Sequence, residues 1–167
     1  MKPTPDEPTP DEWSEAKREP TSRWTGSGRE ALIGAELLQA VVDAARADVP
    51  NEACGLLVSD RYFSDGGAPA RYVPLRNAAE SPYRYMIDPK EQLDAWMALE
   101  DAGEVVWAIV HSHVASAAEP SATDVGLAFY PDSLYVICSL AKWDQPAIRA
   151  WSIVGGAVTE VQLAVTE

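Results

Sequence analysis

The sequence has few basic residues. Only 13 Lys and Arg stand against 26 Asp and Glu, which gives a formal net charge of −13. Nucleic-acid binding is disfavoured, because no cluster of basic side chains is available to neutralise phosphates. The acidity itself says little about partners, since most such charge forms a solvated surface that keeps a protein soluble.

Long apolar runs are also lacking. The longest are about six residues, whereas a membrane-spanning helix needs ~20. We therefore expect no membrane span. The N-terminus has no apolar stretch of the kind that forms a secretory signal, which makes the cytoplasm the expected location.

Cysteine is scarce, and the chain has only Cys54 and Cys138. Two cysteines without a secretory signal do not make a disulfide framework, so we interpret both as buried thiols in strands. Whether the two side chains meet stays open. A local role for Cys54 also stays open, because it lies two residues from Glu52.

The first 30 residues are rich in proline and charge and contain a near-repeat of PTPDE. Such a segment buries too little apolar surface to offset the entropy of ordering it, so we predict a disordered tail over residues 1–30. The chain as a whole is 47% hydrophobic, which suits a packed core. Residues 31–167 are therefore predicted to fold as one domain.

Apolar periodicity in residues 31–167 predicts a mixed α/β domain. Ile33 and Leu37 belong to a helical pattern that Pro50 ends. Asp88 and Pro89 are typical of an N-cap and a first helical position, and they predict a second helix to about residue 102. Strands are predicted over residues 53–58, 71–75, 85–87, 104–110, 134–140, 147–153 and 157–165, with a short helix after Asp124.

Both histidines of the chain, His111 and His113, follow the apolar run VVWAIV. Residues i and i+2 of a strand face the same side, so the two imidazoles are expected side by side. Imidazole is a common zinc ligand, and a catalytic zinc site takes three protein ligands. Asp124 is the third candidate. Ser121 and Asp124 also read as a capping box, and both roles can hold together.

A hydrolytic zinc site needs a general base that does not itself bind the metal. Glu52 fits this role, because the sequence PNEACGLL places its carboxylate at the mouth of a buried strand. Without the histidines, an ordinary loop glutamate would be the simpler interpretation.

Taken together, these residues resemble the JAMM (MPN+) metallopeptidase family, whose signature is an upstream glutamate, then H-x-H, seven residues and S-x-x-D. Glu52, His111, His113, Ser121 and Asp124 match this spacing. The segment E-x-C-G-L-L after the glutamate matches as well. The resemblance spans about residues 31–155. It implies a single MPN/JAB domain with a cytidine-deaminase-like α/β fold, in which helices flank a curved mixed sheet.

The resemblance also implies a role for each matching residue. His111, His113 and Asp124 would bind one zinc ion per chain. Glu52 would be the base that activates water and then passes the proton to the leaving amine. Ser121 would stabilise the oxyanion of the tetrahedral intermediate. A zinc nucleobase deaminase is not expected, because such an enzyme needs H-x-E and C-x-x-C, which the sequence lacks.

One position departs from the family pattern. Val114 stands where a proline usually follows the second histidine. No ligand is lost, so activity is still expected. The bacterial CysO-cysteine peptidases, which look similar around HSHVASAAEPSATDV, also tend to lack that proline. This similarity implies release of cysteine from the tail of a ubiquitin-like sulfur-carrier protein.

Two alternatives to this function stay open. The first is general isopeptidase action on lysine conjugates, and the second is a non-catalytic scaffold, although the intact motif argues against it. Whether the chain forms a homodimer is a separate open question.

Family members bind an extended tail at a sheet edge. Tyr83, Tyr85 and Met86 are candidates to line that groove, and core packing is the alternative for each.

Overall fold

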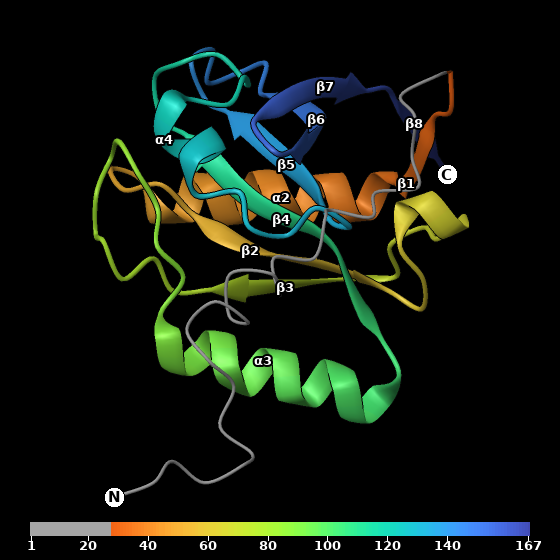
Figure 1. Cartoon of the computed structure of the whole chain (residues 1–167). Helices are drawn as coiled ribbons and strands as arrows, with labels where there is room; N and C mark the ends of the chain where they lie inside the picture. Colours follow the sequence, from red (N-terminus) through yellow and green to blue (C-terminus); the bar gives the residue numbers. More distant parts are fainter. Residues whose placement is uncertain (1–27) are drawn as a thin grey trace, which may run out of the picture.

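A six-stranded mixed sheet lies at the centre of the molecule. The computed structural model describes residues 28–167. The strands of the sheet are β2 (Cys54–Ser59), β3 (Arg71–Leu75), β4 (Val105–His113), β5 (Leu134–Ser139), β6 (Ala147–Val154) and β7 (Ala157–Val161). Their order is β3-β2-β4-β5-β6-β7 (Figure 1). β4 and β5 are parallel, and the other neighbours are antiparallel. The predicted mixed α/β class is confirmed.

Helices cover both faces of this sheet. On one face α2 (Ala35–Asp48) contributes Leu37 and Val41 to a core that includes the fully buried Trp107. On the other face α3 (Pro89–Ala102) contributes Leu99 to a second core. The short elements are a 3-10 turn, η1 (Phe63–Asp65), and α4 (Ala122–Gly126). The sheet is therefore buried on both sides, which explains its nearly continuous apolar strands.

Trp107 forms a β-bulge in β4. Val106 and Ala108, on either side of it, pair with the consecutive residues Val58 and Leu57 of β2. Trp107 is therefore an extra residue in the ladder, and its indole N–H donates instead to the carbonyl of Gly67 at 2.8 Å.

The bulge changes the alternation of side chains along β4. Val106 and Ile109 lie in the same core, under α3, although three residues separate them. Strict alternation would place them on opposite faces. After the bulge the odd-numbered residues face α3, and His111 and His113 follow in that phase.

The first and last elements of the described chain form a second, two-stranded sheet. β1 (Ala31–Gly34) pairs in parallel with β8 (Leu163–Thr166). The helix predicted to include Ile33 therefore begins only at Ala35. The single strand predicted over 157–165 is also wrong, because the chain leaves β7 after Val161 and pairs elsewhere. Residues this far apart in sequence give no local sign that they pair.

Other boundaries differ in smaller ways. The strand predicted over 85–87 is reduced to one bridge between Asn77 and Ile87. α3 begins as predicted, with the Asp88 carboxylate accepting from two backbone N–H groups of the first turn. The short helix expected after Asp124 begins earlier, at Ala122, so Asp124 lies in its first turn.

Cys54 and Cys138 are buried free thiols, as predicted. Cys54 pairs with His111 and Cys138 pairs with Ser112, so β4 lies between them. Two strand spacings of about 4.8 Å exceed the Cα separation that a disulfide allows. The two thiols therefore do not meet.

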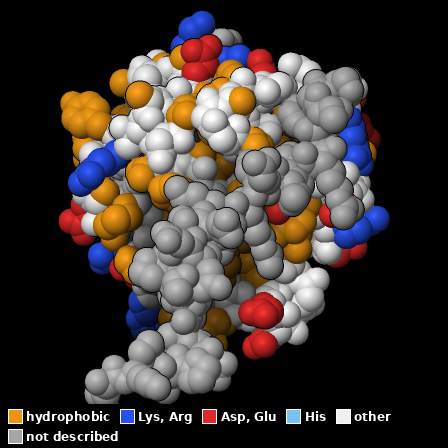
Figure 2. All heavy atoms as spheres, in the orientation of Figure 1, with side chains coloured by type: hydrophobic (Ala, Val, Ile, Leu, Met, Phe, Trp, Pro, Cys, Tyr) orange, Lys and Arg blue, Asp and Glu red, His pale blue; other side chains and the backbone are white. Residues whose placement is uncertain are grey.

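Of the predicted tail, residues 1–27 lie outside the described part, and residues 28–30 are exposed. None of the described helices is long and apolar enough to span a bilayer. On the face shown in Figure 2, the Lys and Arg side chains of the described residues are scattered and form no single patch.

Candidate metal centre

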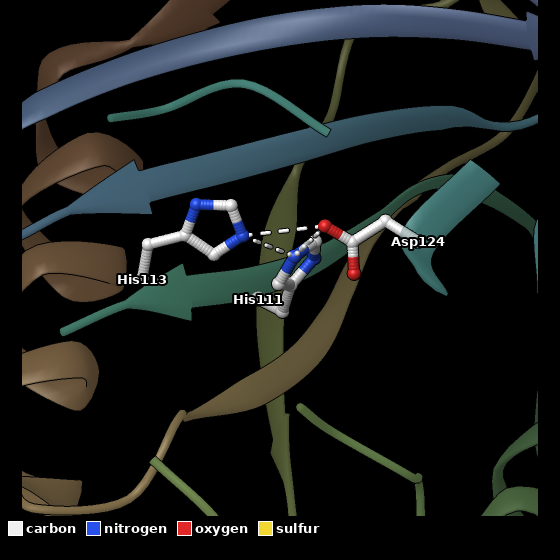
Figure 3. Close-up of side chains that lie close together, drawn as sticks. All are labelled: His111, His113 and Asp124. Atoms are coloured by element: carbon white, nitrogen blue, oxygen red, sulfur yellow. Dashed lines mark hydrogen bonds and ion pairs between the residues drawn. The ribbon is translucent and has the colours of Figure 1, made fainter. Parts of the chain in front are cut away.

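Three buried side chains converge where β4 ends and α4 begins (Figure 3). The Nε2 atoms of His111 and His113 are 3.2 Å apart. Each lies 3.2 Å from Oδ2 of Asp124. Within the described residues, this is the cluster of His, Cys, Asp and Glu whose ligand atoms lie close enough to hold a metal ion. The structure thus brings together the three residues predicted as ligands.

The donor atoms fit a zinc ion. The Nδ1–H of His113 donates to the carbonyl of Ala117 at 2.6 Å, which leaves a lone pair on Nε2 of the neutral ring. Three lone-pair donors at 3.2 Å repel one another unless a proton or a cation lies among them. Tetrahedral zinc, with bonds of ~2.0–2.1 Å, separates its ligand atoms by about 3.3 Å, close to the spacing here.

The two imidazoles are oriented in different ways. His113 is held by its hydrogen bond to Ala117. His111 has no hydrogen-bond partner for its buried Nδ1 within the described chain. Its ring instead stacks on Tyr85, with centroids 4.4 Å apart and an interplanar angle of 22°. Burial lowers the pKa of His111, which favours the neutral ring that a metal ligand requires.

The capping box of α4 positions Asp124. The Ser121 hydroxyl accepts from the backbone N–H of Asp124 at 3.1 Å, and Oδ2 of Asp124 accepts from the backbone N–H of Ser121 at 2.8 Å. Burial opposes ionisation of Asp124. In the metal-free site, the imidazoles of His111 and His113 beside Oδ2, together with the backbone N–H of Ser121, outweigh burial and hold the pKa of this carboxyl well below its usual range. The predicted capping box is thus confirmed, and the same carboxylate faces both imidazoles.

Glu52 lies two residues before the start of β2 and is only 4% exposed. Its Oε2 is buried and has no hydrogen-bond partner among the described residues. Burial raises the pKa of Glu52 to about 7, an effect that nearby His113 opposes and Asp124 reinforces. A carboxylate with this pKa accepts and returns a proton near neutral pH, as a general base must.

The loop between the second histidine and Ser121 is held by β5 and β6. Ser139 donates to the carbonyl of Ser116 (2.5 Å), Trp151 to the carbonyl of Ala118 (2.9 Å), and Arg149 to the carboxylate of Glu119 (2.9 Å). This loop includes Val114, where the family usually has proline. Hydrogen bonds from the sheet thus restrain the segment without that proline. Sequence reasoning missed these residues, because a strand residue gives no sign of which loop crosses it.

The predicted groove residues have different surroundings. Tyr83 is 87% exposed and Met86 is 52% exposed, so the core alternative for both is wrong. Tyr85 is partly buried against the second core and lies on His111. Sequence reasoning also missed Asn77, a buried residue at the base of the same loop. Beside Glu52 opens a cleft of about 620 Å³, which the end of α2 and residues 74–77 help to line.

The model for prokaryotic homologs of the JAB domain matches residues 34–154. The chain belongs to the JAB family. The predicted JAMM/MPN membership, the JAB/MPN fold and the JAMM-type peptidase class are confirmed with it. The matched segment contains both histidines, Ser121, Asp124 and Glu52.

The chain is also similar to named proteins. The chain is 46% identical over 140 residues to the CysO-cysteine peptidases of Mycobacterium bovis and Mycobacterium tuberculosis, covering 81% of this chain and 91% of each relative. It is 38% identical over 98 residues to a desampylase of Haloferax volcanii, covering 58% of this chain and 68% of that protein.

Solved structures show the same fold. A protein from Desulfitobacterium hafniense superposes with a TM-score of 0.73 at 34% identity, covering 82% of this chain and 93% of that one. A JAB1/MPN domain protein from Archaeoglobus fulgidus superposes with a TM-score of 0.56 at 20% identity, covering 83% of this chain and 100% of that one. The second likeness bears on the fold alone.

Proposed function

We propose that this chain is a zinc peptidase that hydrolyses the amide bond after the C-terminal tail of a ubiquitin-like sulfur-carrier protein and releases cysteine. The carrying observation is the 3.2 Å triangle of His111, His113 and Asp124 in a chain that is 46% identical to CysO-cysteine peptidases. Residues 31–167 form the catalytic domain in this proposal. The cytoplasmic location and the homodimer stay predictions.

His111, His113 and Asp124 would hold one zinc ion. Zinc at such a site supplies a Lewis acid that polarises a carbonyl and makes water lose its proton near neutral pH. Glu52 takes that proton on its unpartnered Oε2, which a pKa of about 7 allows. The water oxygen bonds to the scissile carbon, the C–N bond breaks, and Glu52 returns the proton to the leaving nitrogen.

The Ser121 hydroxyl donates a hydrogen bond to the oxyanion. The hydroxyl oxygen accepts from the N–H of Asp124, so its own proton is free to point outward. Ser121 is exposed, which leaves it accessible to a substrate. One such donor is typically worth ~10²–10³ in turnover.

Tyr83 and Met86 are the proposed contacts for the carrier tail. Both side chains are exposed. Tyr85, which lies between them on the same loop, stacks on His111. A tail that passes this loop reaches the triangle directly.

The similarity to a desampylase supports a second candidate, the release of a ubiquitin-like protein from lysine conjugates. The bond cleaved is chemically the same, so the site residues do not separate the two. The difference lies in the size of the leaving group, which is one amino acid in the first case and a protein in the second.

Intact mass measurement separates the two candidates. The zinc-loaded chain is incubated with a carrier–cysteine adduct and, in parallel, with a carrier–lysine conjugate. We expect faster cleavage of the cysteine adduct. Equal rates would remove the preference for cysteine release. Cleavage of neither, with carrier binding retained, would favour a non-catalytic scaffold.

Glu52→Gln is the control for this assay. The amide has nearly the same shape but takes no proton, so we expect zinc to bind in a 1:1 ratio while turnover falls by ~10²–10⁴. Unchanged turnover in this variant would contradict the role of Glu52.

A further inference from the structure

Asn77 is 6% exposed, and its amide makes four hydrogen bonds. Nδ2 donates to the backbone carbonyls of Glu52 at 3.0 Å and Arg84 at 3.1 Å. Oδ1 accepts from the backbone N–H groups of Ala79 and Met86, each at 3.0 Å. The two N–H groups and both lone pairs of the amide oxygen are therefore used.

These bonds close the neck of a nine-residue loop, 78–86. The backbone of Asn77 faces Ile87 in an antiparallel bridge, and the N–H of Ala78 donates to the carbonyl of Met86 at 2.7 Å. One buried side chain thus holds both ends of the loop together and joins them to the backbone of Glu52.

The closed loop reaches the metal centre at two points. The carbonyl of Ser81 accepts from the backbone N–H of Glu52 at 2.9 Å. Tyr85 stacks on His111, whose Nδ1 has no hydrogen-bond partner within the described chain. The stacked Tyr85 ring thus orients the imidazole of His111, whereas a hydrogen bond to a backbone carbonyl orients that of His113.

We propose that Asn77 is a positioning residue for both halves of the site. Through its bond to the carbonyl of Glu52 it holds the backbone of the base. Through loop 78–86 it holds Tyr85 against His111 and so sets the plane of a metal-binding ring. This inference rests on the proposed function for the roles of Glu52 and His111.

The chemistry of the amide explains why asparagine is needed. Aspartate has the same shape but has no N–H to donate. Its second oxygen would face the carbonyls of Glu52 and Arg84, so two attractive contacts would become repulsive. Asn77→Asp is therefore the test variant. Asn51→Asp is the matched control, because it adds the same charge next to Glu52 at a side chain with no hydrogen bond among the described residues.

Three quantities are measured on folded protein. Zinc affinity is obtained by competition with a chromophoric chelator, which needs no substrate, and kcat and KM are obtained on zinc-saturated protein with the carrier–cysteine adduct. For Asn77→Asp we expect zinc affinity and kcat each to fall by roughly 10- to 100-fold. KM is expected to rise as well, because the loop that Asn77 closes carries Tyr83 and Met86, the proposed contacts for the carrier tail, so zinc affinity and kcat are the quantities that decide. Asn51→Asp stays close to wild type in all three.

A purely structural role would give a different result. Asn77→Asp would then unfold at a lower temperature, but its folded, zinc-saturated form would keep the kcat and zinc affinity of the Asn51→Asp control. That result would overturn the proposal.

Tyr85 tests the same route if Asn77→Asp does not fold. Tyr85→Phe keeps the stacked ring and is expected to bind zinc as wild type does. Tyr85→Leu removes the ring and is expected to weaken zinc binding by about 10-fold. Equal affinities in the two variants would contradict the route through the loop.

The zinc measurement also separates this proposal from the proposed function. If the wild-type chain cleaves no carrier adduct, the proposed function fails. The zinc affinities of Asn77→Asp and Asn51→Asp still decide whether Asn77 positions the site, since they depend on no substrate.

Discussion

The hydroxyl of Ser112 accepts a 2.7 Å hydrogen bond from the backbone N–H of Ala53, and the backbone N–H of Ser112 donates to the carbonyl of Ala53 at 3.0 Å. These bonds join the residue after Glu52 to the residue between the two histidines. The Ser112 side chain points away from the imidazoles, as alternation along a strand requires. It therefore helps to set the spacing between base and ligands from behind the site.

Ser112→Ala is expected to destabilise the fold. It leaves the buried N–H of Ala53 without this acceptor, which costs ~1–3 kcal/mol of unfolding free energy. Urea unfolding of the metal-free protein measures the loss. Ser116→Ala is the control, since the Ser116 side chain is exposed and only its carbonyl is used in the loop. Equal stabilities of the two variants would show that the Ser112 hydroxyl is dispensable.

Ser121 is expected to have two separable effects. Ser121→Ala removes the N-cap of α4, which costs ~1 kcal/mol, and the oxyanion donor, which costs ~10²–10³ in kcat. Ser121→Asn retains a capping oxygen, so it should recover most of the stability. Thermal unfolding and kcat on the carrier–cysteine adduct measure the two effects. If Ser121→Ala lost only stability and kept kcat, the oxyanion role would be wrong.

Both thiols are expected to react slowly in the native protein. Burial raises the pKa of Cys54 to about 12 and that of Cys138 to about 11, and the thiolate is the reactive form. At about pH 8 we expect iodoacetamide to label neither residue quickly, whereas denatured protein gains two adducts by intact mass. Rapid labelling of Cys54 in native protein would instead point to an open, reactive thiol beside the base.

Metal removal is expected to destabilise the protein reversibly. Zinc that binds only the folded chain stabilises it by ~2.7 kcal/mol at 100 times its Kd. Chelation should therefore lower the Tm, and added zinc should restore it. Asp124→Asn should abolish this zinc-dependent shift, while Asp101→Asn, the same change at an exposed helix position, should keep it. A zinc-dependent shift of normal size in Asp124→Asn would exclude Asp124 as a ligand.

The candidate ligands could be predicted from sequence because their geometry is local. His111 and His113 are two residues apart on a strand, and Asp124 is fixed by a capping box with Ser121 that spans one helical turn. Side-chain direction within a strand and bonding within a helix's first turn follow from spacing alone. The roles of these residues in catalysis stay predictions.

Residues that act across the fold could not be found in the same way. Asn77 contacts the backbone of Glu52, 25 residues earlier, and Trp151 holds Ala118, 33 residues earlier. A lone Asn after a strand or a Trp within one is compatible with many environments. Their partners are backbone groups, which leave no mark on residue type.

The sequence by itself determined the family, the α/β class, most of the strands and the residues of the metal motif, because periodicity and short spacings encode local geometry. Only the tertiary structure decided the phase of β4, where the bulge at Trp107 places both histidines toward α3. It also decided the parallel pairing of β1 with β8. Both depend on which strands become neighbours, and that choice is made by burial over the whole chain rather than by any one segment.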